Sequence, residues 1–386
     1  MSKLKFFSDK NTNKDKYSVL PNKDNPRIIV PLKNFKLFIN GFKVQNTASF
    51  KNRLIKNSLP LGYPFFKNIA SNIVYSTMEL ENLVDTTRKA INDDRVSYVS
   101  VYVGTDRSKN RKLTFLLMDD SGNNIGILKY PIEKESVLFI ENEYNTLNTL
   151  TKDNFNTFRF PSKTILFDFE YDKVLYQENI FHDTNQLKNE LNEIIVNAAV
   201  ELAIKTKRDN LFIYLNDILN KLNDIKELSY FKESYKSILE KLLNLELPLI
   251  SIHGDFVIYN MQSDSKRLHL IDWEYFREGL PLYDLFHFVF QGKYQIEKKS
   301  VHQCIMCVFN KRNMKFYNYY LSKLNLNINF LKMNKIIIDL FFVYLIDILI
   351  FEINTKTELE LYKNHFYRAI TNFITDRFSF SNKFIR

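Results

Sequence analysis

Apolar and polar residues alternate in the middle of the chain, and this alternation predicts five strands and one helix between residues 96 and 180. The stretch VSYVSVYV, residues 96–103, places Val99, Val101 and Val103 on one face, which is typical of a strand. Two further strands, LTFLLMDD and IGILKYP, precede a helical segment, ESVLFIENEYNTLNTL, and the runs KTILFDF and KVLYQENI complete the set. We therefore expect a compact α+β unit over residues 96–180.

The rest of the chain after this unit has the spacing of helices. Asp183 or Thr184 can cap a helix in which apolar residues recur every three or four positions. Segments rich in Leu and Ile predict more helices over residues 210–245 and from about Tyr283 onward. A short β run, LPLISIHGDF, and a hairpin at Asp264–Arg267 interrupt them.

The first 95 residues give weaker signals. Residues 1–25 are polar, and we expect them to fray. Residues 27–42, RIIVPLKNFKLFINGF, predict a small strand pair, and residues 76–92 predict a helix. We expect this extension to pack on the following unit from about Arg27.

One apolar stretch has the length of a membrane span. Residues 336–353 read IIIDLFFVYLIDILIFEI, which reaches the lower limit for crossing a bilayer. Asp339, Asp347 and Glu352 interrupt it, and a carboxylate is costly in hydrocarbon. A buried helix is therefore favoured over a transmembrane span.

Composition and charge narrow the class of protein. The chain has 386 residues, of which 45% are hydrophobic and 25% charged, as in globular proteins. Two cysteines and no apolar leader favour a cytoplasmic location. Residues 1–60 hold 13 Lys or Arg against 3 Asp or Glu, which equals the net charge of +10 of the whole chain. Such an arm can meet a polyanion, but no RNA-binding signature accompanies it, so no nucleic-acid partner is expected.

Three polar side chains stand at fixed intervals among apolar residues in IHGDFVIYNMQSDSKRLHLIDWEYFREGLPLYD, residues 252–284. Asp255 and Asn260 lie five residues apart after a β run, so one loop can direct both into a cleft, and Asp272 ends the next apolar run. Polar groups that end buried strands cost free energy unless they are paired or bind a ligand. Two carboxylates and an amide supply the hard oxygen atoms that suit Mg²⁺ beside a phosphate.

The order of these residues is that of the catalytic and metal-binding segments of kinases. The loop reads H-G-D-F-V-I-Y-N from His253, and I-D-W-E follows around Asp272. Both segments resemble the aminoglycoside phosphotransferase and choline kinase superfamily, as does G-x-P-x-x-D-L at Gly279–Leu285. The resemblance covers about residues 96–300, and the next helix follows Asp272 too soon for the activation segment of a protein kinase.

The resemblance implies a protein-kinase-like α+β fold of two lobes. A basic N-terminal extension, residues 1–95, would precede a small β-rich N-lobe, residues 96–180. A large helical C-lobe that carries the catalytic loop would follow, residues 181–386.

The same resemblance implies a nucleotide site in the N-lobe. Lys129, at the end of the third expected strand, would contact the α- and β-phosphates, with Glu143 fixing its position and Glu141 as the competing partner. The phosphate loop from Gly104 has one glycine where the family has three. We expect six residues in this site, three of them at the hinge that ends the fifth strand: Gly104, Lys129, Glu143, Gln177, Glu178 and Asn179.

In the C-lobe, the resemblance assigns catalysis to the loop. Asp255 would orient the acceptor hydroxyl and take its proton, and Asn260 and Asp272 would hold Mg²⁺ on the phosphates. His253 is interpreted as a packed loop anchor, and Asp284 as a residue that caps a helix or steadies the loop.

The implied function is phosphoryl transfer from ATP or GTP, with Mg²⁺, to a hydroxyl of a small molecule: a sugar, an amino alcohol, an aminoglycoside or a cell-envelope precursor. The helical half has no dense acidic run for a polycation, which ranks sugars and envelope precursors first. Two alternatives stay open, namely a non-catalytic binding module on the same fold and, with less support, a protein kinase. Oligomeric state is not predicted.

The pair Cys304 and Cys307, with His302 nearby, admits a metal or redox interpretation. A lone C-x-x-C without a second ligand pair is a weak metal signal, and CIMCVF is an apolar helical stretch. Core packing is the favoured interpretation.

Overall fold

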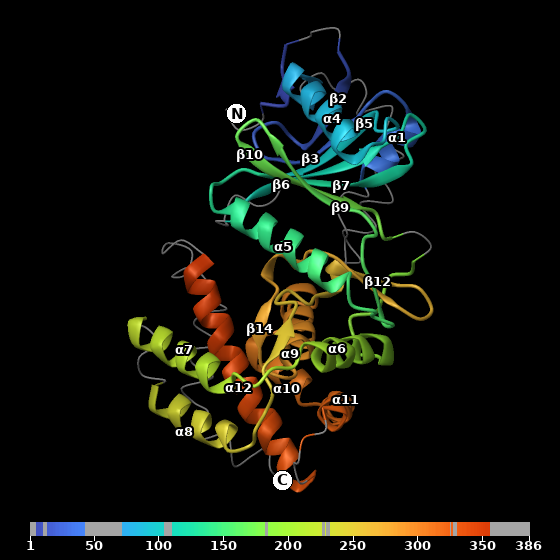
Figure 1. Ribbon diagram of the computed structural model, residues 1–386. Helices are drawn as coiled ribbons and strands as arrows, with labels where there is room; N and C mark the ends of the chain where they lie inside the picture. The colour runs from blue at the N-terminus through green and yellow to red at the C-terminus, as the bar shows by residue number, and fades with distance from the viewer. Residues whose placement is uncertain are drawn as a thin grey trace. The chain divides into compact units, whose positions relative to one another are not determined.

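The computed structural model divides the chain into two compact units, each described by itself below (Figure 1). The first unit comprises Met1–Asn154 and Phe160–Asp183, and the second comprises Phe155–Arg159 and Thr184–Arg386. The structure describes residues 5–10, 14–42, 72–103, 110–181, 184–225, 228, 232–324, 326 and 330–355.

An antiparallel sheet forms the centre of the first unit. Its nine strands stand in the order β1-β4-β2-β3-β5-β6-β7-β10-β9. In chain order their bounds are β1 Phe7–Ser8, β2 Lys16–Pro21, β3 Pro26–Pro31, β4 Ile73–Ser76, β5 Tyr98–Val103, β6 Lys112–Met118, β7 Asn124–Pro131, β9 Thr164–Phe169 and β10 Asp172–Glu178. The five strands expected after residue 96 are all present.

Three described helices accompany this sheet. They are α1 Phe35–Gly41, α4 Met78–Ile91 and α5 Ser136–Leu150. Figure 1 shows α5 along one face of the sheet, where it packs against β7, β9 and β10. The helices expected before and within the sheet, α4 and α5, are confirmed.

The N-terminal residues differ from expectation in two ways. Residues 1–25 do not fray over their described part, because β1 and β2 belong to the sheet and bury Phe6, Tyr17 and Val19. The second strand expected within residues 27–42 is instead helix α1, because the side chain of Asn34 accepts a hydrogen bond from the Leu37 N–H and caps it.

These N-terminal strands continue the sheet of the expected N-lobe. Ile29 of β3 stands opposite Val101 of β5, in antiparallel register. Such pairing covers the backbone edge that β5 would otherwise expose. The limits predicted for the extension and the lobes, at residues 95 and 180, stay predictions.

The second unit is mainly helical. Its helices are α6 Glu193–Thr206, α7 Leu211–Asp224, α8 Lys232–Leu243, α9 Tyr283–Gln291, α10 Val301–Val308, α11 Lys311–Lys323 and α12 Phe330–Thr355, with a π-helix at Gly292–Ile296. Its short strands are β8 Phe158–Arg159, β11 Ile250–Ile252, β12 Met261–Ser263, β13 Leu268–Leu270 and β14 Arg277–Gly279. The fold class is thus α+β as predicted, with a β-rich first part and a helical second part.

Two details of this unit bear on the sequence predictions. Helix α6 begins at Glu193, well after Asp183 and Thr184, because the Asn192 side chain accepts from the Ile195 N–H and caps it there. Helix α12 contains the long apolar stretch and packs against α7, α8, α9 and α11 (Figure 1). Among the described residues, no helix is long and apolar enough to cross a membrane.

Candidate functional site

The β12–β13 hairpin brings two of the predicted metal ligands to one end. Met261 pairs with Leu270 in antiparallel register, and the Ile271 N–H donates to the Asn260 carbonyl at 2.9 Å. Asn260 therefore enters the hairpin at the point where Asp272 leaves it. This proximity follows from backbone pairing, so it is fixed by the fold of the segment.

Asp255 is held directly by Asn260. The Asn260 side-chain Nδ2 donates to Asp255 Oδ2 at 2.9 Å and to the Asp255 carbonyl at 3.0 Å. Both bonds close the five-residue loop on itself. They also orient the amide, because its nitrogen faces Asp255 and its oxygen is the atom that could meet a cation.

Asp272 has a backbone conformation that few residues adopt. Its φ of 70° and ψ of 55° lie in the left-handed region, which costs a non-glycine residue free energy. Asp tolerates that region better than most residues, and strained conformations of this kind cluster at active sites. The turn directs the residue out of β13 before the short 3-10 helix Trp273–Tyr275 begins.

His253 anchors the loop from inside, as predicted. The fully buried ring accepts the Asp255 N–H at Nδ1, at 3.2 Å, so its proton is on Nε2, 3.1 Å from the Ile271 carbonyl. Burial lowers the pKa of His253, which favours this neutral form. One ring thus ties Asp255 to the strand end that precedes Asp272.

Asp284 steadies the same loop from helix α9. Its two carboxylate oxygens accept the backbone N–H groups of His253, at 2.8 Å, and Gly254, at 3.2 Å. Burial raises the pKa of Asp284, although the bonds from the two N–H groups act in the opposite direction. The predicted role of a loop support rather than a substrate ligand agrees with these contacts.

Gly254 is required by the shape of the loop. Its φ is +83°, and a Cβ at this position would lie 2.5 Å from the carbonyl oxygen of Tyr275. The loop therefore lies directly on the backbone that follows Asp272. A side chain here would have to move one of the two segments.

The predicted lysine–glutamate pair is present in the first unit. Lys129 of β7 places Nζ 2.7 and 2.5 Å from the two carboxylate oxygens of Glu143 on α5. Both side chains are buried, with 4% and 0% exposure. The partner is Glu143, so the competing choice of Glu141 is not taken.

The three hinge residues stand at the end of β10. Gln177 is buried, and its Nε2 has no hydrogen-bond partner, which marks an unused donor in this strand. Asn179 accepts the Phe181 N–H at 3.0 Å and turns the chain. Glu178 accepts a hydrogen bond from Ser162. Their contact with a nucleotide base stays a prediction.

The predicted residues therefore form two groups. Asn260 and Asp272 lie at one end of the β12–β13 hairpin of the second unit, and Asn260 holds Asp255 there, while Lys129 and Glu143 form a pair in the first unit. Gly104 lies outside the described residues. The convergence of the two groups on one nucleotide stays a prediction.

Sequence reasoning missed one residue that contacts the predicted catalytic loop. His287 of α9 places Nε2 3.4 Å from Asp255 Oδ1. It lies three residues after Asp284, so the helical repeat puts both on the face that meets the loop. The three-residue spacing from Asp284 could have indicated a role for His287. However, a histidine in an apolar helix is hard to distinguish by sequence from a residue of the hydrophobic core.

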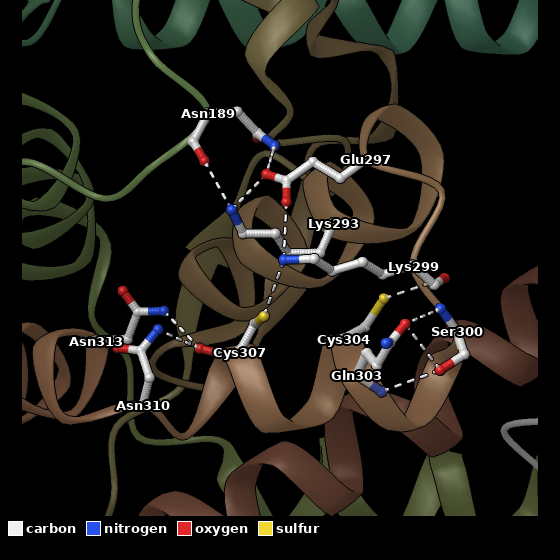
Figure 2. A network of polar contacts seen from close by, with 10 residues as sticks. All are labelled: Asn189, Lys293, Glu297, Lys299, Ser300, Gln303, Cys304, Cys307, Asn310 and Asn313. Atoms are coloured by element: carbon white, nitrogen blue, oxygen red, sulfur yellow. Dashed lines mark hydrogen bonds and ion pairs between the residues drawn. The ribbon is translucent and has the colours of Figure 1, made fainter.

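The C-x-x-C motif lies in a separate polar network around α10 (Figure 2). Cys304 is buried, and burial raises the pKa of its thiol to about 12. Cys307 Sγ lies 3.6 Å from Lys299 Nζ, and Ser300 forms a capping box with Gln303 at the start of the helix. The burial of Cys304 agrees with the core-packing interpretation for that residue, whereas Cys307 is only half-buried.

Comparison with known proteins supports the motifs. Residues 201–298 match the sequence model of a family described as "Phosphotransferase enzyme family". The match contains the catalytic loop, the hairpin and Asp284, so the resemblance to aminoglycoside phosphotransferases and choline kinases is confirmed there. The match supports a phosphotransferase activity for this protein. None of the curated proteins matches the chain.

Solved structures of small-molecule kinases are also similar. A choline kinase LicA from Streptococcus pneumoniae is 15% identical, with a TM-score of 0.48, over 77% of this chain and 99% of that one. An ethanolamine kinase from Plasmodium vivax is 12% identical, with a TM-score of 0.49, over 88% and 96%. A GDP complex of an aminoglycoside 2'-phosphotransferase-IIIa is 11% identical, with a TM-score of 0.46, over 78% and 99%.

Proposed function

We propose that this protein transfers the γ-phosphoryl group of a nucleoside triphosphate, ATP or GTP, to a hydroxyl group of a small molecule. The observation that carries the proposal is the loop in which Asn260 holds the Asp255 carboxylate. This loop leads into the β12–β13 hairpin, which Asp272 follows. The family match over residues 201–298 supports the same reaction class.

Asp255 is the residue that acts on the acceptor. Its carboxylate accepts a hydrogen bond from the acceptor hydroxyl, aligns the oxygen with the γ-phosphorus and takes the proton as the new P–O bond forms. The bond from the γ-phosphorus to the bridging oxygen breaks, and the nucleoside diphosphate leaves. Most of the rate gain in such reactions comes from positioning and charge stabilisation.

Asn260 and Asp272 suit the Mg²⁺ that the fold implies. The Asn260 amide oxygen, on a side chain whose nitrogen binds Asp255, and the Asp272 carboxylate, on a left-handed turn, are hard oxygen donors of the kind that Mg²⁺ prefers. Bound there, Mg²⁺ would neutralise charge on the β- and γ-phosphates. The backbone pairing of the hairpin holds both of these oxygen donors at the same end.

Lys129 and the hinge supply the nucleotide side of the site. The ammonium group of Lys129, held by Glu143, would contact the α- and β-phosphates. Gln177, Glu178 and Asn179 would meet the base, and Gly104 the phosphates. Use of a nucleoside triphosphate supports the expected cytoplasmic location.

The acceptor is a small hydroxylated molecule. Similar structures include enzymes named for choline, ethanolamine and aminoglycosides, so amino alcohols and aminoglycosides belong in the test. Sugars and cell-envelope precursors rank first, because the helical half has no dense acidic run to bind a polycation.

The test is a panel of hydroxyl acceptors assayed for nucleoside diphosphate release, with Asp255→Asn as the matched variant. This change keeps size and one acceptor oxygen, so Mg-nucleotide affinity should stay near wild type while turnover falls by about 10²–10⁴. Product formation and nucleotide affinity are measured on the same samples, with a chelator control for Mg²⁺. Equal turnover by both proteins would remove Asp255 from the reaction and favour a binding module.

A further inference from the structure

His287 contacts the one oxygen of Asp255 that Asn260 does not hold. Its Nε2 lies 3.4 Å from Asp255 Oδ1, while Asn260 Nδ2 binds Oδ2 at 2.9 Å. The His287 side chain is 8% exposed, and that of Asp255 is 34% exposed. Each oxygen of the carboxylate therefore lies next to a buried polar group, and the carboxylate still reaches solvent.

The far side of the imidazole is also constrained. His287 Nδ1 lies 3.4 Å from the hydroxyl of Tyr344 on α12, and the Tyr283 ring stacks parallel to the imidazole, with centroids 6.3 Å apart. A phenol that donates to Nδ1 leaves the imidazole proton on Nε2, where it faces Asp255. Contacts from helices α9 and α12 therefore fit one tautomer of this ring, in which Nδ1 accepts from Tyr344 and the Nε2–H faces Asp255.

We propose that His287 is a positioning residue for phosphoryl transfer: it donates its Nε2–H to Asp255 Oδ1, and Tyr344 selects the tautomer that makes this possible. The inference rests on the proposed function, because Asp255 is the group that acts on the acceptor. With Asn260 on one oxygen and His287 on the other, rotation of the carboxylate about its Cβ–Cγ bond would break both contacts, so the two residues together restrain its orientation.

This arrangement predicts which kinetic constant depends on His287. The residue contacts the acceptor-activating carboxylate, so its loss should lower kcat by about 10–100-fold, the range for a misoriented reacting group. The KM for nucleotide should stay within about twofold. A purely structural residue would instead lower stability and change both constants together.

The variants distinguish two roles of His287: a hydrogen-bond donor to Asp255, or a side chain that only fills space in the core. His287→Gln keeps a side-chain N–H that reaches a position like that of Nε2, and it should retain most of kcat. His287→Leu fills the space without a donor and should show the full loss. Tyr344→Phe keeps the ring, removes the hydroxyl and should give a smaller loss. Equal losses in the Gln and Leu variants would overturn the proposal.

A spectroscopic readout keeps the inference separate from the proposed activity. The chain has 6 histidines, so ¹⁵N-histidine NMR can resolve the imidazoles, and His287→Gln identifies the His287 signals by their disappearance. We expect an Nε2–H tautomer whose Nε2 proton shift changes in Asp255→Asn, and a mixture of tautomers in Tyr344→Phe. An Nδ1–H tautomer, or an unchanged proton shift in Asp255→Asn, would refute the contact. If no acceptor reacts with wild type, the proposed function fails, and NMR still decides the contact.

Discussion

At the residue scale, the sequence reveals groups whose spacing along the chain is itself informative. Asp255, Asn260 and Asp272 could be predicted because a short loop and a hairpin hold them, and such segments keep linear order in space. His287 contacts Asp255 from another element, 32 positions along the chain, and the only local signal was its three-residue spacing from Asp284. The hinge side chains are intermediate, because the end of a strand is readable but the direction of each side chain is not.

Gly254 provides a prediction at this scale. Gly254→Ala should lower the free energy of unfolding by about 1–3 kcal/mol and also lower turnover, because the residue has a φ of +83° and its Cβ would lie 2.5 Å from the Tyr275 carbonyl. Urea unfolding and initial rates measure the two effects.

The matched control for that change is Gly122→Ala. Gly122 also has a positive φ, +75°, but the nearest atom to its Cβ would be 3.4 Å away, at Leu37. It should lose stability through backbone strain alone and keep its turnover. If Gly254→Ala behaves like Gly122→Ala, the close packing of the catalytic loop does not matter for the reaction.

At the scale of elements, the periodicity of apolar residues predicts whether a segment forms a helix or a strand, provided that the segment's own residues determine its structure. The strands β5, β6, β7, β9 and β10 and helix α5 follow this rule. Helix α1 does not, because KNFKLFING has the apolar content of a strand and the deciding group is one capping side chain, Asn34. The late start of α6 at Asn192 has the same cause. At helix ends, a capping side chain can determine where the helix begins, because the apolar periodicity is least informative there.

The buried ion pair between Lys129 of β7 and Glu143 of α5 leads to a prediction about stability. Glu143→Gln removes the carboxylate charge that pairs with the Lys129 ammonium at 4% exposure, so the free energy of unfolding should fall by about 3–5 kcal/mol. Nucleotide affinity should fall as well, since the lysine loses its fixed position. Thermal unfolding and calorimetry with nucleotide give both quantities.

Glu141→Gln is the control on the same helix. Glu141 is the glutamate that does not pair with Lys129, so its neutralisation should change stability by about 0.5 kcal/mol or less. Equal effects of the two substitutions would show that the pair contributes nothing specific, and the nucleotide role of Lys129 would lose its structural support.

At the scale of the whole molecule, the sequence is least informative about which strands become neighbours. Ile29 pairs with Val101 across a separation that no window of sequence spans. Residues 1–25 are polar on average, yet Tyr17 and Val19 of β2 are buried because β2 lies between β3 and β4. Average polarity predicted fraying, whereas burial depends on the partners that the fold supplies.

Deletion of residues 1–25 tests this assembly. It removes Phe6, Tyr17 and Val19 from the core and separates β3 from β4, so the melting temperature should fall by several degrees. Burying each such side chain is worth about 1.5–3 kcal/mol. Differential scanning calorimetry of the full chain and the truncated chain measures the difference.

Single substitutions in β2 show whether burial is the cause. Val19→Ala removes buried methyl groups and should cost about 1–3 kcal/mol, whereas Lys16→Ala changes an exposed position of the same strand and should cost less than about 0.5 kcal/mol. A truncated chain that melts within about 2 °C of the full chain, together with a neutral Val19→Ala, would mean that β2 adds no stability. The sheet from β5 onward would then fold without the N-terminal strands, and their role would lie outside the stability of this unit.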